Sequence, residues 1–312
     1  MHTLVTGATG FVGNRLVPAL LEAGHDVSVL VRDATSYDAP EEVTIFEGDL
    51  LEPASFAGAL EDVDAAYYLV HSMGSGGGFE HRDRQAARGF ERAASDAGLE
   101  RVIYLSGLGD DRDGLSEHLR SRREVETLLS AGTYDLTVLR AAVIVGDGSA
   151  SFRMIRQLAT RLPVMVTPRW VYTECQPIAV EDVIAYLVGV LEAPETAGET
   201  YEIGGPEVLT YREMLEETAR KLGGRDPVVL PVPFLTPRLS AYWVDLVTDV
   251  PASVAHPLID GMGNRVVVTD PRIRDVLDVE LTPFPVAVER ALEAERRGRP
   301  DGLESPPPVG GS

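Results

Sequence analysis

The chain has 312 residues, which is enough for one large domain or two modest ones with a sizeable core. Its 49 acidic side chains outnumber the 28 basic ones, giving a formal net charge of −21. This excess argues against binding to nucleic acid or to an anionic membrane surface, because both are polyanions. The composition is typical of the acidic proteome of a salt-rich cytoplasm, and it also fits an ordinary acidic enzyme.

Cysteine content and hydropathy bear on the compartment. Cys175 is the one cysteine, so we expect no internal disulfide and no cysteine-built metal site, which fits a reducing compartment. Met1 leads almost directly into the first expected strand, which predicts that there is no signal peptide. No apolar run approaches the ~18 to 20 residues of a membrane span. The sequence therefore predicts a cytoplasmic protein without a transmembrane segment.

The first expected element is an apolar strand that runs into a glycine-rich turn and then into an amphipathic helix. Glycines at three-residue steps let the backbone turn sharply and approach a pyrophosphate without a Cβ in the way. The positive end of the helix would then face the phosphates. A second apolar strand at residues 27–31 completes a βαβ unit, which favours a dinucleotide site over a purely structural turn. The predicted cofactor-binding residues of this turn are Thr6, Gly7, Thr9, Gly10, Phe11, Val12 and Gly13.

The end of the second strand carries the side chains that would read the adenosine ribose. An acid at this position binds the 2′-hydroxyl of NAD, whereas an arginine binds the 2′-phosphate of NADP. The sequence offers both, as Arg32 followed by Asp33. Arg32 comes first, so we expect NADP(H) in preference to NAD(H); a surface ion pair at a strand end is the alternative interpretation.

Two further strand ends are expected to contribute to the same site. A third strand at residues 43–47 runs into Asp49 and Leu50, and the carboxylate there is a candidate acceptor for the adenine amino group or part of an ordinary Asp turn. The fourth strand, residues 65–70, is continuously apolar, as central parallel strands are. It ends in Val70 and His71, which we expect over the ligand, with a polar strand-end cap as the alternative for His71.

The fifth strand and the helix after it suggest a catalytic arrangement. A long, charge-rich helix at residues 79–97 precedes this strand, which spans residues 102–105 and delivers Ser106 at its end. On the next helix His118 and Arg122 are four residues apart and therefore share a face. The layout is that of a reductase active site, although a helix so rich in cationic residues produces such a pair by chance as well.

The chain changes character near residue 147. A sixth apolar strand extends over residues 136–146, after which strands shorten and strict βα alternation stops. We expect an α/β fold, with a Rossmann-type doubly wound parallel sheet over residues 1–147 completed by later segments. A smaller C-terminal α/β substrate lobe follows at residues 148–304, and a disordered tail at 305–312. Within the lobe, Thr210 and Glu213 have the spacing of a capping box.

Two features of the lobe concern ligands and partners. Arginines at positions 153, 156, 161 and 169 form a cationic patch, which is either a site for an anionic group of a small-molecule substrate or a set of internal ion pairs. Residues 228–260 mix prolines with large apolar side chains. This stretch is interpreted as a helical piece of the lobe, with a lid, a dimer face or a peripheral membrane patch as alternatives. A monomer and a homodimer are both compatible with the sequence.

With these residues in view, the chain resembles the atypical extended short-chain dehydrogenase/reductases, close to the NmrA-like and nucleotide-sugar-epimerase-like groups. The resemblance covers at least residues 1–290. It is carried by the T-G-x-x-G-x-x-G fingerprint at residues 6–13, the Gly-Asp-Leu turn at 48–50 and Ser106. Residues 67–74 and 118–125 look like a branch described only as NAD(P)H-binding. The resemblance implies cofactor binding.

The chain departs from that family at the catalytic motif. Where the family has Tyr-x-x-x-Lys, this sequence reads His118, Leu119, Arg120, Ser121, Arg122. An imidazole transfers protons near neutral pH without a lysine, and a guanidinium can hold ribose hydroxyls and bias the imidazole towards neutrality.

Three functions remain open on this basis. The first is an oxidoreductase that passes hydride between NADP(H) and a small carbonyl, alcohol or quinone, with Ser106 polarising the oxygen and His118 as acid/base. The second is binding without turnover, as in NmrA-like redox sensors or the accessory subunit of respiratory complex I. The third is nucleotide-sugar epimerase or dehydratase chemistry.

Overall fold

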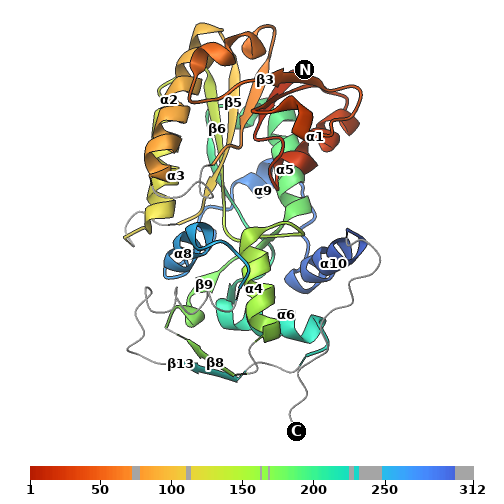
Figure 1. Cartoon of the computed structure of the whole chain (residues 1–312), viewed down its shortest axis with the longest axis vertical. Helices are drawn as coiled ribbons and strands as arrows, with labels where there is room; N and C mark the ends of the chain where they lie inside the picture. The colour runs from red at the N-terminus through yellow and green to blue at the C-terminus, as the bar shows by residue number, and fades with distance from the viewer. Residues whose placement is uncertain are drawn as a thin grey trace.

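A seven-stranded parallel sheet forms the centre of the molecule (Figure 1). The computed structural model describes residues 1–71, 78–109, 114–161, 164–167, 169–224, 228–231 and 248–298. The strand order is β11-β6-β5-β4-β1-β2-β3. The strands are β1 (His2–Thr6), β2 (Asp26–Val31), β3 (Thr44–Glu47), β4 (Ala65–Tyr68), β5 (Arg101–Gly107), β6 (Asp135–Ala141) and β11 (Thr200–Ile203). The expected Rossmann-type doubly wound fold is confirmed.

Helices cover both faces of this sheet, which is why its strands are almost uniformly apolar. On one face α1 (Gly13–Glu22) packs beside α5 (Val180–Glu192), and on the other α2 (Phe79–Asp96) packs beside α3 (Glu117–Leu129) (Figure 1). Each face has its own core: Leu16, Tyr67 and Leu187 belong to the first, and Tyr68 and Phe90 to the second.

Whereas α9 (Ile273–Val276) lies near β11, most of the remaining elements gather below the carboxyl ends of the strands in the view of Figure 1. Here α4, α6, α8 and α10 share a third apolar core. The predicted capping box at the start of α6 is confirmed, because the Thr210 hydroxyl accepts from the Glu213 N–H and the Glu213 carboxylate accepts from the Thr210 N–H. The helices are α4 (Ala150–Arg161), α6 (Tyr211–Lys221), α8 (Ala252–Gly261), α9 (Ile273–Val276) and α10 (Phe284–Arg297). The short strands are β7 (Ile144–Val145), β8 (Val164–Thr167), β9 (Glu174–Cys175), β10 (Ile178–Ala179), β12 (Leu209–Thr210) and β13 (Val228–Pro231).

The sixth strand is shorter than the sequence predicts. β6 ends at Ala141, whose ladder partners are the last residues of β5 and β11, Gly107 and Ile203. Both neighbouring strands end at this level, and the chain then leaves the sheet. It forms β7, which pairs with β10 instead. The predicted strand over residues 136–146 was therefore wrong at its carboxyl end.

Two expectations fall partly or wholly outside the described residues. Of the apolar stretch 228–260, the structure describes β13, residues 248–251 and α8. Its large side chains Phe234, Leu235, Tyr242, Trp243 and Leu246 lie outside the described part, as does the expected tail at 305–312. The assignment of residues 1–147 and 148–304 to separate domains stays a prediction.

Candidate functional site

A cavity of about 250 Å³ lies at the carboxyl ends of β1, β2, β3 and β4. It is lined by nine residues predicted to bind the cofactor: Thr6, Gly7, Thr9, Gly10, Arg32, Asp49, Leu50, Val70 and His71. Seven further residues complete the lining: Leu30, Val31, Gly48, Leu51, Leu69, Arg82 and Ala86. Four separate strand ends and α2 therefore converge on one cavity, as a doubly wound sheet requires.

The glycine turn at the floor of the cavity leaves no room for side chains. Gly7 has φ +74°, and a Cβ there would lie 2.9 Å from the backbone of Leu69. A Cβ at Gly13 would lie 2.2 Å from the Gly7 carbonyl oxygen. No side chain caps the start of α1 at Val12, and the first N–H groups of a helix attract anions. The turn fits a pyrophosphate.

Three predicted cofactor residues do not line this cavity. Gly13 is buried against the turn itself, and Val12 is the residue before α1. The Phe11 ring lies 4.8 Å from the Arg15 guanidinium and packs against the loop at Gly146. These residues shape the turn and the helix start.

Arg32 and Asp33 have separate surroundings. The Asp33 carboxylate accepts hydrogen bonds from the Thr35 hydroxyl at 2.6 Å and the Thr35 N–H at 2.9 Å, which cap a short 3₁₀ helix, Ala34–Ser36. These bonds lower the pKa of Asp33. Arg32 lines the cavity and Asp33 does not. Of the two, the guanidinium is therefore the group available to an adenosine ribose.

Asp49 stabilises a turn and also borders the cavity. Its Oδ1 accepts from the Leu51 N–H at 2.9 Å, as in an Asx turn, and its own N–H donates to the Ser55 hydroxyl. The carboxylate borders the cavity all the same. Both interpretations of this residue are therefore compatible with its position.

His71 connects the cavity to a buried polar cluster between α2 and α3. Its Nδ1 lies 2.9 Å from Oδ2 of Asp83, and the side chains of His71 and Asp83 are 11% and 4% exposed. The Ser121 hydroxyl lies 3.5 Å from the same Asp83 oxygen. The His118 ring lies 5.1 Å from the His71 ring, centroid to centroid, with the planes inclined by 52°.

Both imidazoles are held in their neutral form. Burial, and next the charge of Arg122, lower the pKa of His71 to about 4, against the opposing influence of Asp83. Burial, Arg122 and His71 lower the pKa of His118 well below its ordinary value, and Asp83 again opposes them. Among the described residues, Nε2 of His71 and Nδ1 of His118 are buried without a hydrogen-bond partner.

Ser106 and Arg122 lie beside this cluster. Ser106 ends β5, is 4% exposed, and its hydroxyl has no partner in the described part of the chain. The Arg122 guanidinium donates to the Leu105 carbonyl at 3.5 Å, and its aliphatic stem passes Gly107. Arg122 therefore touches both chain neighbours of Ser106. None of Ser106, His118 and Arg122 lines the cavity itself; His71 provides the connection.

Two buried tyrosines, Tyr68 and Tyr104, also lie close to this cluster. Tyr68 and Tyr104 pack edge to face with ring centroids 5.9 Å apart. Burial raises the pKa of both. Their phenols therefore stay protonated at neutral pH and are poor substitutes for the tyrosine of the family motif.

Asp83 and Arg82 are the functional candidates that sequence reasoning missed. The sequence indicates a charge-rich helix at residues 79–97 that is solvated on one face. The other, buried face carries Asp83 in line with Ala87, Phe90 and Ala94. An acid within an apolar stripe at helical spacing was a readable signal, because a carboxylate is buried only where it finds partners.

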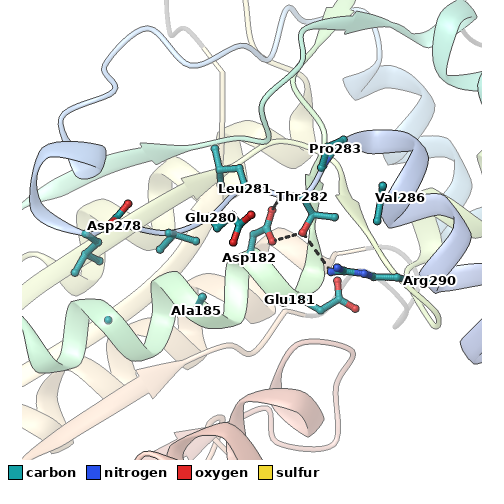
Figure 2. Close-up of a pocket in the computed structure, with 13 residues that line it drawn as sticks. Glu181, Asp182, Ala185, Asp278, Glu280, Leu281, Thr282, Pro283, Val286 and Arg290 are labelled. Carbon is teal, nitrogen blue, oxygen red and sulfur yellow. Dashed lines mark hydrogen bonds between the residues drawn. The ribbon is translucent and has the colours of Figure 1, made fainter.

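A second cavity, of about 570 Å³, lies away from this cluster, between α5 and the segment that leads into α10 (Figure 2). Asp182 is central to it and accepts 2.8 Å hydrogen bonds from both the N–H and the hydroxyl of Thr282. Arg290 donates to the same hydroxyl at 3.3 Å (Figure 2). These bonds fasten the segment to α5, which is a structural role.

Two of the four arginines of the predicted cationic patch form internal ion pairs. Arg156 lies 3.1 Å from Glu295, and Arg161 lies 2.8 Å from Asp249. The side chain of Arg169 is outside the described residues. In the part of the chain that the structure describes, no group of three His, Cys, Asp or Glu side chains could hold a metal ion. Within the same part, no helix is long and apolar enough to cross a bilayer.

Comparisons with known proteins identify the family of the chain. Residues 7–169, more than half of the chain, match a family described as NAD(P)H-binding. The chain is 28% identical over 226 residues to the mitochondrial NADH dehydrogenase [ubiquinone] 1 alpha subcomplex subunit 9 of Arabidopsis thaliana. That match covers 68% of this chain and 56% of the plant protein, so the chain spans little more than half of that relative.

Two further proteins represent the reductase and epimerase relatives. The ceramide reductase of Caulobacter vibrioides is 28% identical over 237 residues, 73% of either protein. The UDP-glucuronic acid 4-epimerase of Bacillus cereus, solved with UDP-glucuronic acid and NAD, superposes with a TM-score of 0.71 at 18% identity. The superposition covers 95% of this chain and 99% of the epimerase chain. At this low identity the similarity shows a common fold and nothing more. The resemblance to the atypical short-chain dehydrogenase/reductases is confirmed.

Proposed function

Because the chain belongs to the NAD(P)H-binding family, we propose that it is an oxidoreductase that moves hydride between NADP(H) and a small carbonyl, alcohol or quinone. The observation that carries this proposal is the position of His71. It lines the cavity that ends in the glycine turn, and its ring lies 5.1 Å from that of His118. A nucleotide site and a group able to transfer protons thus adjoin each other.

NADP(H) is the proposed cofactor, with NAD(H) as the weaker alternative. Arg32 lines the cavity while the Asp33 carboxylate is engaged by Thr35, and Arg82 adds a second guanidinium to the lining. A guanidinium binds phosphate through paired, charge-assisted hydrogen bonds. When bound, the reduced nicotinamide supplies the hydride.

His118 is the proposed acid/base. In alcohol oxidation the neutral imidazole takes the hydroxyl proton, and it then releases that proton to solvent. In carbonyl reduction the protonated imidazole returns a proton to the oxygen that gains charge. Since the pKa of His118 lies well below its ordinary value, oxidation is ready at neutral pH and reduction accelerates as the pH falls.

Ser106 and Arg122 have supporting roles in this proposal. The buried, unpartnered Ser106 hydroxyl can donate a hydrogen bond to the substrate oxygen and polarise it. Arg122 keeps His118 neutral and, through the Leu105 carbonyl, holds α3 against β5.

The test is direct transfer of the label from NADPH that carries deuterium at C4 to a panel of aldehydes, ketones and quinones. Reduced product that carries deuterium on the former carbonyl carbon is the expected result for the aldehydes and ketones, and NADPH oxidation is the readout for the quinones. Binding of NADPH without transfer to any of them would favour a cofactor-binding protein without turnover, which the missing Tyr and Lys of the family motif also suggest. Exchange confined to a nucleotide sugar would favour the epimerase alternative.

A further inference from the structure

The proposed function assigns no role to Asp83, which forms a buried pair with His71. A carboxylate that is 4% exposed needs partners, and Asp83 has His71 Nδ1 at 2.9 Å and the Ser121 hydroxyl at 3.5 Å. As an ionised acceptor beside a neutral ring, Asp83 holds the ring proton on Nδ1. The Nε2 atom of His71 is then left as a hydrogen-bond acceptor.

That acceptor lies beside a second ring with an unpartnered nitrogen. The centroids of the two rings are 5.1 Å apart, and on each ring one buried nitrogen has no hydrogen-bond partner in the described residues: Nε2 of His71 and Nδ1 of His118. Two buried, unpartnered nitrogens on neighbouring rings can satisfy each other if one is an acceptor and the other carries a proton. Catalytic hydrogen bonds of this kind are often long until a ligand binds.

We propose that Asp83 and His71 are a positioning pair for His118. The carboxylate fixes His71 as the Nδ1–H tautomer, and the free Nε2 of His71 then favours Nδ1–H on His118, which reserves Nε2 of His118 for the substrate oxygen. The inference rests on the proposed function, because it assigns the orientation of its acid/base group. In alcohol oxidation the O–H bond of the substrate breaks and its proton binds to Nε2 of His118. His71 and Asp83 keep their own protonation states.

The charged and titratable groups around the two rings come from α2 and α3. Asp83 acts on both rings from α2 and Arg122 from α3, and Arg82 of α2 lines the same cavity as His71. Tyr68 and Tyr104 on the strands stay neutral. Asp83 is the group whose charge opposes the lowering of both imidazole pKa values. Removal of the Asp83 charge should therefore lower the pKa of both His71 and His118.

Nitrogen-15 NMR of histidine-labelled protein above pH 7 tests the assignment without any turnover. Variants His71→Gln and His118→Gln identify the two resonance pairs among the six histidines. Both rings should show Nδ1–H in the unmutated protein, although Nε2–H is the ordinary tautomer of a free histidine side chain. An Nε2–H signal from His71 or from His118 would overturn the proposal.

Variants of Asp83 test the positioning role. Asp83→Ala should return His71 to Nε2–H. Asp83→Asn retains an acceptor oxygen of the same shape, so it should keep the tautomer while shifting the pKa of both rings further down. Asp96→Ala, an exposed carboxylate on the same helix, should change neither. If His71 keeps its Nδ1–H tautomer in Asp83→Ala, Asp83 does not position the ring. If Asp83→Ala does not fold, Asp83→Asn provides the test, and unchanged pKa values of His71 and His118 in that variant would contradict the role of Asp83.

Failure of this inference can be told apart from failure of the proposed function. If both rings carry Nδ1–H but no substrate is turned over, the tautomer assignment stands and the oxidoreductase proposal falls. If label transfer occurs and His118 carries Nε2–H, the function stands and the positioning pair is wrong.

Discussion

The rings of His71 and His118 lie 5.1 Å apart, on elements that are distant in the sequence. The Arg122 charge acts on both of them and lowers the pKa of each. Two imidazolium ions and a guanidinium would repel one another strongly at this distance in a buried site. The neutral pair is therefore part of the folded state, and its protonation opposes folding.

This relationship predicts a pH-dependent stability. The pKa of His71 is about 4 when folded and near 6.5 when unfolded, so the unfolded chain binds more protons between these values. Stability due to His71 is complete above pH 6.5 and is lost as the pH falls towards 4, by an amount on the order of 3 kcal/mol.

Urea unfolding of the unmutated protein, His71→Gln and His81→Gln at pH 7 and pH 4.5 measures this loss. His81 is exposed on α2 and serves as the control. The loss of unfolding free energy should be smaller in His71→Gln and unchanged in His81→Gln. Equal losses in all three proteins would show that His71 does not contribute.

Arg32→Ala should weaken binding of NADP(H) and leave NAD(H) almost unaffected. The lost contact is a hydrogen bond to a charged group, worth roughly 1.5 to 3 kcal/mol. Titration calorimetry with both cofactors measures the difference, with Arg88→Ala on the exposed side of α2 as the control. Equal affinities of the unmutated protein for the two cofactors would exclude the assignment of Arg32 to the 2′-phosphate.

Gly13→Ala should distort the glycine turn. The new Cβ would meet the Gly7 carbonyl oxygen at 2.2 Å, and a backbone atom cannot move aside as a flexible side chain can. Overpacking of this kind costs typically about 1 to 3 kcal/mol. A lower melting temperature and weaker NADPH binding are expected. Gly58→Ala, where a Cβ meets nothing within 4 Å, should affect neither.

The sequence predicted the sheet and the glycine turn because their signals are local. Apolar runs ending in polar residues mark buried parallel strands, and the spacing of Gly7, Gly10 and Gly13 follows from contacts within one turn. The capping box at Thr210 is equally local. Nine of the cavity residues could be named for the same reason.

The rest depends on packing between distant segments. Asp83 becomes functional only because α2 packs on α3 and brings it to His71 and Ser121. The early end of β6 depends on where its neighbours stop. The bond between Asp182 and Thr282 joins parts of the chain that no local pattern relates.

The net charge of −21 predicts a response to salt. Mutual repulsion of surface carboxylates should destabilise the fold in dilute buffer, and screening should restore it. Thermal unfolding in dilute buffer and in molar KCl measures this. A melting temperature that stays constant or falls with added KCl would remove the argument for a salt-rich habitat.

The central claim is that His118 transfers a proton to or from the substrate. NADPH oxidation by His118→Ala, with aldehydes, ketones and quinones, tests it most directly, with binding of NADPH measured in parallel and Arg120→Ala on the exposed side of α3 as the control. The account predicts that kcat falls about 10² to 10⁴-fold in His118→Ala while NADPH binding is almost unchanged. Full activity in that variant, or no turnover in the unmutated protein with any substrate of the panel, would contradict it.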